Sequence, residues 1–216
     1  MNTPRPHSTP LAPIRSMGPG HRERMFRHLV ALSPEDRYLR FGYAANDAHI
    51  RRYIDGINLE TDDVFGIFNR RLELVAMAHV AYSDQLGHQH CAEFGVSVLS
   101  RARGRGYGAR LFDRAVMHAR NQGVSMLFIH ALSENTAMLK IARNAGARVH
   151  QDGSESQAYL QLPPAGLDTR MSKIVAEHFG EVDYQLKKQA RQFWSLLADM
   201  QEIRQGVQDG RHQAAE

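Results

Sequence analysis

The stretch CAEFGVSVLSRARGRGYG, residues 91–108, decides the fold of this chain. Its first half alternates as a half-buried strand does, with Phe94, Val96 and Val98 on one face and Glu93 on the other. Its second half is rich in glycine, and the residues after it change to a helical period. The stretch therefore predicts a strand that turns through a glycine-rich loop into a helix.

The glycine-rich loop carries two arginines and three alternating glycines, namely Arg103, Gly104, Arg105, Gly106 and Gly108. Glycines let successive backbone amides converge, and the start of a helix adds unpaired N–H groups with roughly half a positive charge. Arginine side chains add charge-assisted hydrogen bonds to phosphate oxygens. The loop is therefore a candidate cradle for an anion such as a diphosphate.

Other nucleotide-binding motifs do not fit this loop. A dinucleotide-binding fingerprint needs a glycine three residues after Gly108, where Leu111 stands, and a Walker loop needs Gly-Lys-Ser/Thr. Two interpretations remain beside phosphate binding: a tight turn with solvated arginines, and an arginine-glycine tract that binds RNA. The tract is short and lies inside a strand-helix pattern, which disfavours RNA.

The residues on either side of this stretch predict an antiparallel sheet followed by a crossover unit. We expect, in chain order, short helices at 20–32 and from 33 onward, strands at 64–68, 72–82 and 91–99, a helix at 106–120, a strand at 124–132, a helix at 133–146 with Ser133 as its N-cap, and short strands at 148–151 and 157–162. The expected fold class is α/β (α+β layered), with a mixed, mostly antiparallel sheet of six or seven strands and helices on both faces.

The composition is that of an ordinary globular protein. Of 216 residues, 43% are hydrophobic and 23% are charged, which argues against a disordered or fibrous chain. The single cysteine, Cys91, excludes an internal disulfide, so we expect a reducing, cytoplasmic setting. No apolar run is long enough for a membrane helix, and MNTPRPHSTP lacks the apolar core of a secretory signal. A formal net charge of +4 suggests an anionic ligand without the basic surplus of a dedicated nucleic-acid binder.

Composition shifts divide the chain into three segments. Residues 1–10 are expected to form a flexible proline-rich lead-in, 11–164 one domain, and 165–216 an amphipathic helical extension. The extension either covers an exposed face of the same domain or forms a homodimer, since the aromatic pair Phe193 and Trp194 suits both uses.

The span 14–162 resembles the GNAT superfamily of N-acetyltransferases, which use acetyl-coenzyme A. The family signature Arg/Gln-x-x-Gly-x-Gly/Ala is matched within 103–108, and its later motif, an asparagine that begins a helix ending in glycine, is matched within 135–146. The stretches LSPEDRYLRF, AEFGV and LSENTAMLKIARNAG most resemble the bacterial protein lysine acetyltransferases of the Pat type.

The resemblance implies the ligand and its contacts. The 103–108 loop would hold the diphosphate of acetyl-coenzyme A, the main chain at Val96 and Val98 would bind its pantetheine arm, and Asn135 would make a further cofactor contact. The reaction would move an acetyl group to a primary amine, on a protein lysine or a small molecule.

Glu93 is the candidate general base. An amine attacks a thioester only in its neutral form, and a lysine with a pKa of about 10.4 is almost fully protonated at pH 7. Glu93 resembles the strand glutamate that is the family's base, and proton removal could contribute roughly 10²- to 10⁴-fold. The alternative is a solvated residue on a half-exposed strand face.

Two positions depart from the family pattern. The tyrosine that many members use to protonate the departing thiolate is Ala142 here, and the phenylalanine after the motif glycine is Ala147. A thiol with a pKa of about 8.5 leaves as a tolerably stable anion, so water suffices as the acid.

The remaining polar residues are lesser candidates. His88, His90 and Cys91 lack the second ligand cluster that a metal site needs, so no metal is expected. His130 faces either the core or the cleft. Two other function classes stay open: a catalytically silent domain that binds acyl-coenzyme A and acts through its C-terminal helices, and an RNA-binding protein.

Overall fold

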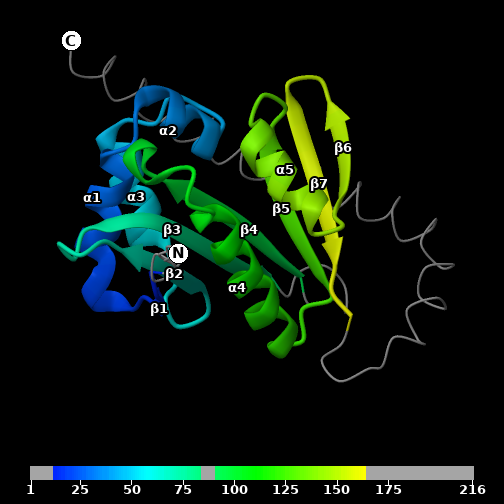
Figure 1. The fold of residues 1–216 in the computed structure, drawn as a ribbon, viewed down its shortest axis with the longest axis horizontal. Coiled ribbons are helices and arrows are strands. Elements are labelled where there is room, and N and C mark those ends of the chain that lie inside the picture. The colour runs from blue at the N-terminus through cyan, green and yellow to red at the C-terminus, as the bar shows by residue number, and fades with distance from the viewer. Residues whose placement is uncertain (1–11, 84–90, 164–216) are drawn as a thin grey trace, which may run out of the picture. The chain divides into compact units, whose positions relative to one another are not determined.

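The computed structural model describes residues 12–83 and 91–163, which form a seven-stranded sheet with the order β1-β2-β3-β4-β5-β7-β6 (Figure 1). The strands are β1 (Ile14–Ser16), β2 (Asp63–Phe68), β3 (Leu74–Ser83), β4 (Cys91–Val98), β5 (Met126–Leu132), β6 (Arg148–Asp152) and β7 (Glu155–Gln161). Only β4 and β5 pair in parallel among these strands, as a crossover through a helix requires. The expected mixed, mostly antiparallel sheet is confirmed.

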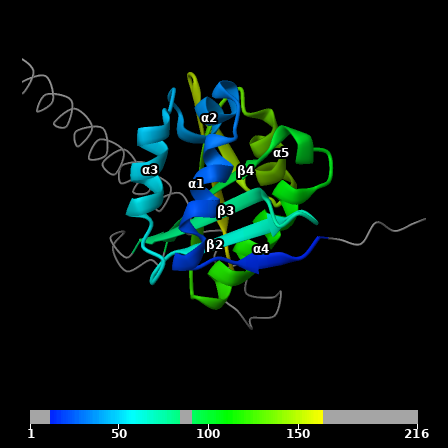
Figure 2. The ribbon, with the colours of Figure 1, turned by 90° about the vertical axis from the view of Figure 1, so that its left-hand side faces the viewer.

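Five α-helices accompany the sheet within the described residues: α1 (Arg22–Val30), α2 (Pro34–Phe41), α3 (Asp47–Gly56), α4 (Tyr107–Asn121) and α5 (Thr136–Asn144). Single 3₁₀ turns, η1 (Pro19–His21) and η2 (Ser100–Ala102), precede α1 and the glycine-rich loop. One face of the sheet contacts α1 and α2, with α3 against α1, and the other face contacts α4 (Figure 2). Helices on both faces are therefore confirmed.

The region before β2 differs from the expectation of two short helices. The helix α3 is a third, and of its ten residues it buries only Ile50 and Ile54. Its start is marked by Asn46, whose side chain accepts a hydrogen bond from the His49 amide at 2.9 Å. The three-residue strand β1 was also not expected, because its pairing with β2 is a tertiary contact.

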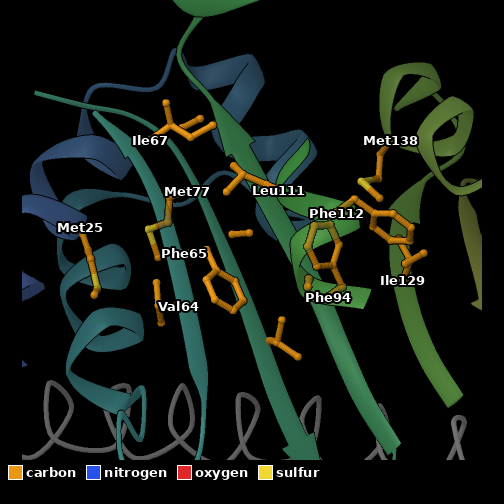
Figure 3. Packing of buried hydrophobic residues seen from close by; sticks show 14 of the residues in the cluster. Met25, Val64, Phe65, Ile67, Met77, Phe94, Leu111, Phe112, Ile129 and Met138 are labelled. Carbon is orange, nitrogen blue, oxygen red and sulfur yellow. The ribbon is translucent and has the colours of Figure 1, made fainter. Parts of the chain in front are cut away.

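The strand β4 has the alternation that its sequence predicts. Phe94 faces α4, where its ring meets the Phe112 ring edge-on at 5.0 Å between centroids (Figure 3). The opposite face, with Glu93, lies on the side of α1 and α2, and Ser97 there bonds His28 of α1. This strand therefore joins the core on one face to a polar layer on the other.

The two central strands separate along their length. The parallel register of β4 and β5 covers only Cys91–Glu93 against Met126–Phe128, although β4 continues to Val98 and β5 to Leu132 (Figure 1). Beyond Glu93 the edge of β4 that faces β5 is therefore not used by a strand pairing, and a cleft opens there.

Candidate acyl-transfer site

A cavity of about 570 Å³ lies at this separation of β4 and β5. Its wall includes the end of β4, the glycine-rich loop with the start of α4, the N-terminal part of α5, and α2. Seven of the nine residues predicted for the site line it: Val96, Val98, Arg103, Gly104, Gly106, Gly108 and Asn135. Residues distant in sequence thus form one elongated site.

The glycine-rich loop has the backbone that an anion cradle needs. Gly104 and Gly106 both adopt the left-handed region, with φ of 74° and 70°, and Gly106 is the N-cap of α4. Helical bonding in α4 starts with the Arg110 amide on the Gly106 carbonyl at 3.1 Å, so the preceding amides have no partner within the helix. These N–H groups and the helix dipole favour an anion at this wall of the cavity.

The two loop arginines differ in their surroundings. Arg103 lines the cavity and donates a hydrogen bond to the buried Asp36 of α2, which also accepts from the Ser100 hydroxyl at 3.2 Å. Arg105 is exposed and is not part of the cavity wall. Sequence reasoning missed Asp36, since nothing local marks a helix N-terminal aspartate as the partner of an arginine 67 residues away.

Asn135 begins α5, as the motif predicts, and connects it to α2. Its Oδ1 accepts from the Met138 amide at 3.2 Å, and its Nδ2 donates to the Leu39 carbonyl at 3.4 Å. The expectation that Ser133 is the N-cap is wrong. The Ser133 hydroxyl instead donates to the Gly153 carbonyl at 3.1 Å, because the turn between β6 and β7 lies beside it.

Glu93 is half-buried on β4 and lies outside the cavity wall, just before the strands separate. Burial raises the pKa of its carboxyl, while the charge of Arg40 and then the charges of His130 and His79 oppose that rise. A carboxyl in this setting holds its proton more tightly than a solvated one does. It is therefore a stronger base when ionised.

Two further side chains at the cavity were not predicted. Arg40 of α2 contributes to its wall, and so does Ser97 of β4. The Ser97 hydroxyl lies 2.8 Å from Nε2 of the buried His28, and the Nδ1 of that ring lies 3.0 Å from the Leu74 carbonyl. No sequence motif marks either residue, and both line the cavity only because of the tertiary structure.

The other candidate residues take structural places. Burial raises the pKa of the Cys91 thiol to about 11, and His88 and His90 lie outside the described residues. Across 12–83 and 91–163 no group of three His, Cys, Asp or Glu could hold a metal ion. His130 lies 3.3 Å from the Glu155 carboxylate.

Within residues 12–83 and 91–163 no helix has the length and apolar character that crossing a membrane demands. The lead-in 1–10 and the extension 165–216, with its expected dimer, lie outside the described residues.

The cavity fits coenzyme A by its chemistry. A left-handed glycine before a helix start, free amides and arginine side chains suit a diphosphate, and the unpaired edge of β4 suits the amide-rich pantetheine arm.

Known proteins were compared with the chain and with its structure. The model of the acetyltransferase (GNAT) family matches residues 26–147, which is more than half of the chain. A comparison with curated proteins finds no match.

Three solved structures illustrate the likeness of the fold. The GNAT domain of PAT from S. lividans has a TM-score of 0.60 at 19% identity, over 70% of this chain and 90% of that one. An N-acetyltransferase from Staphylococcus aureus has 0.57 at 13%, over 71% and 99%. Spermidine N-acetyltransferase from Vibrio cholerae, solved with CoA and spermine, has 0.54 at 15%, over 69% and 95%. The family match and the cavity together identify the chain as a member of the acetyltransferase (GNAT) family, an acyltransferase whose acetyl donor is acetyl-coenzyme A.

Proposed function

We propose that this chain transfers the acetyl group of acetyl-coenzyme A directly to a primary amine, with Glu93 as the general base. The observation that carries the proposal is the position of Glu93: a half-buried carboxylate with a raised pKa, on β4, beside the point where the cavity opens. A carboxylate whose pKa is raised by burial suits proton removal near neutral pH better than a solvated glutamate does.

The step balances without a covalent enzyme intermediate. The neutral amine nitrogen forms a bond to the thioester carbonyl carbon, the carbon–sulfur bond breaks, and coenzyme A leaves as a thiolate. The amine gives one proton to Glu93, directly or through water. Ala142 is fully buried in α5 and offers no proton, so solvent protonates the thiolate, which is tolerably stable at a thiol pKa of about 8.5.

The cavity wall supplies binding and orientation. The amides of Gly104, Gly106 and Gly108, with Arg103 and Arg105 nearby, would hold the diphosphate at the start of α4. The main chain at 96–98 would align the pantetheine arm and, near Val98, polarise the thioester carbonyl. Asn135 supports this arrangement by fixing α5 against α2, and holding two reactants in line is itself a large part of such a rate enhancement.

The acceptor is a protein lysine or a small amine. A catalytically silent domain that binds acyl-coenzyme A is the alternative. The half-buried Glu93 favours the enzyme, because a carboxyl with a raised pKa beside a binding cavity is a candidate general base.

The test follows free-thiol release from acetyl-coenzyme A against lysine peptides, polyamines, amino acids and aminoglycosides. Glu93→Gln is expected to abolish turnover of the best amine and to leave coenzyme A affinity, measured by calorimetry, unchanged. Glu60→Gln, at an exposed carboxylate in the turn before β2, is the matched control and keeps wild-type turnover. Full activity in Glu93→Gln would refute Glu93 as the base, and binding without turnover on every amine would favour the silent domain.

A further inference from the structure

A chain of hydrogen bonds runs through the polar layer between β3 and the helices α2 and α3. The Arg40 Nη2 donates to the Tyr53 hydroxyl at 2.7 Å, the hydroxyl lies 2.8 Å from His79 Nδ1, and His79 Nε2 lies 3.0 Å from the Asp62 carboxylate. The four side chains come from α2, α3, β3 and the turn before β2. Each is half-buried, so the chain is only partly exposed to water.

The chain has one self-consistent direction. The Asp62 carboxylate can only accept, so His79 Nε2 carries a hydrogen and, in the neutral ring, Nδ1 is the acceptor. Tyr53 therefore donates its hydroxyl hydrogen to His79 and accepts from Arg40. Burial raises the pKa of Tyr53, which keeps that hydrogen in place. Each bond of the chain thus has one donor and one acceptor, and the last one holds the Nη2 group of Arg40.

The position of Arg40 depends on the absence of a side chain at Gly95. A Cβ atom built on Gly95 would lie 2.6 Å from Arg40 Nη2 and 2.7 Å from its Cζ, far inside van der Waals contact. The guanidinium thus occupies the place of a side chain on the polar face of β4. The rings of Phe41 and Tyr53, at 5.2 Å and 5.3 Å from Cζ, support it from the helix side.

Gly95 is the next position after Glu93 on the same face of β4, so the guanidinium occupies the side-chain position that neighbours Glu93 on that face. The other groups that face Glu93 are His79, opposite Gly95 on β3, and His130, two residues beyond its parallel partner Phe128 on β5. Among these groups Arg40 most strongly opposes the effect of burial on the pKa of Glu93.

We propose that Arg40 is a further functional residue of the acetyl-transfer site: seated on Gly95 and held by the Asp62–His79–Tyr53 chain, its guanidinium keeps Glu93 ionised and ready to take the amine proton. The inference rests on the proposed role of Glu93 as the base. It makes Tyr53 and His79 positioning residues, which act on the reaction through Arg40.

The test reads the ionisation of Glu93 without an acceptor amine. The full chain is labelled with δ-¹³C glutamate, Glu93→Gln assigns the Glu93 carboxyl resonance, and a pH titration gives its pKa. Arg40→Gln is expected to raise that pKa by more than about half a unit, since it removes a neighbouring opposite charge. Arg40→Lys keeps the charge and is expected to shift it less. Gly95→Ala displaces the guanidinium while leaving every charge in the chain, and is expected to act in the same direction as Arg40→Gln.

The outcome separates this inference from the proposed function. If the pKa of Glu93 in both Arg40→Gln and Gly95→Ala is the same as in the wild type within the error of the titration, the inference is overturned even where Glu93→Gln is inactive. If the titration moves as expected, the acidic limb of kcat/KM for the best amine must move by the same amount. A limb that stays in place would show that another group is the base, and would overturn the proposed function instead.

Discussion

Lowering the pH should destabilise this fold through one buried histidine, His28. Its Nδ1 lies 3.0 Å from the Leu74 carbonyl, which only accepts, so Nδ1 carries the hydrogen and Nε2 accepts from the Ser97 hydroxyl at 2.8 Å. Only the Ser97 bond requires the neutral ring, because Nδ1 keeps its hydrogen when the ring is protonated and Nε2 then no longer accepts. Burial lowers the pKa of His28 from 6.5 to about 4, while its hydrogen bonds and neighbouring arginines make smaller contributions.

The size of the effect follows from the two pKa values. The unfolded chain binds a proton at His28 near pH 6.5 and the folded chain only near pH 4, so the stability that His28 confers is complete above pH 6.5 and is lost as the pH falls toward 4. At about 1.4 kcal/mol per unit the full loss is about 3 kcal/mol, and about 2 kcal/mol of it falls between pH 7.5 and pH 5. That is a large fraction of the roughly 5 to 15 kcal/mol that stabilises a domain.

The assay compares urea unfolding of the wild type and His28→Asn at pH 7.5, 6 and 5. The wild type is expected to be the more stable at pH 7.5, and its advantage should shrink by about 2 kcal/mol at pH 5 because the variant has no ring to protonate. His150→Asn, at an exposed position of β6, removes an imidazole without opening the core and serves as control. An advantage that stays constant, or grows, as the pH falls would refute the reasoning.

Further predictions concern the cradle, the base and the core. The side chains introduced by Gly106→Asp and Gly106→Asn have the same shape, and both tolerate a left-handed backbone. Calorimetry should give a coenzyme A affinity at least about tenfold lower for the aspartate, because of its charge beside the diphosphate. Equal affinities would place the phosphates elsewhere. Glu93→Gln should raise Tm at pH 7.5, because the raised pKa of Glu93 means that its ionised form costs folding stability once the pH exceeds the folded pKa, and a lower Tm in scanning fluorimetry would contradict this. Phe112→Ala should lower the free energy of unfolding by about 3 to 5 kcal/mol in urea, since the ring is buried against Phe94; a loss under about 1 kcal/mol would mean that the core closes over the gap. Asn135→Ala should cost about 1 kcal/mol and Asn135→Asp less, because the aspartate retains the cap on α5, and the reverse order would deny the cap.

The local patterns of the central strand and its loop were sufficient to predict the core of the fold. The alternation around Phe94, the glycines at 104–108 and the helical stripe after them each act within a few residues, and each is confirmed by the structure. The parallel pairing of β4 and β5 agrees with the crossover unit that the strand-helix-strand pattern predicts. The predicted roles of Glu93 and the loop residues stay predictions: Arg103 and the loop glycines line the cavity, whereas Glu93 and Arg105 lie outside its wall.

Other elements depended on partners that no local pattern reveals. The helix α3 has few apolar residues of its own and packs against α1, and the strand β1 exists through its pairing with β2. The N-cap of α5 is Asn135 and not the predicted Ser133, whose hydroxyl donates to the Gly153 carbonyl in the turn between β6 and β7.

The sequence by itself determined most of the strands and helices, all but β1 and α3, and the loop that suits a diphosphate, because backbone preferences and short periodicities act between near neighbours. Only the tertiary structure decided the polar surroundings of the site. Arg103 and Asp36 are 67 residues apart in the chain, and His28 and Ser97 are 69 apart. The guanidinium of Arg40, on α2, lies against Gly95 of β4. Charge and burial act through space, so the pKa of a group such as Glu93 depends on residues that folding brings beside it rather than on those next to it in the chain.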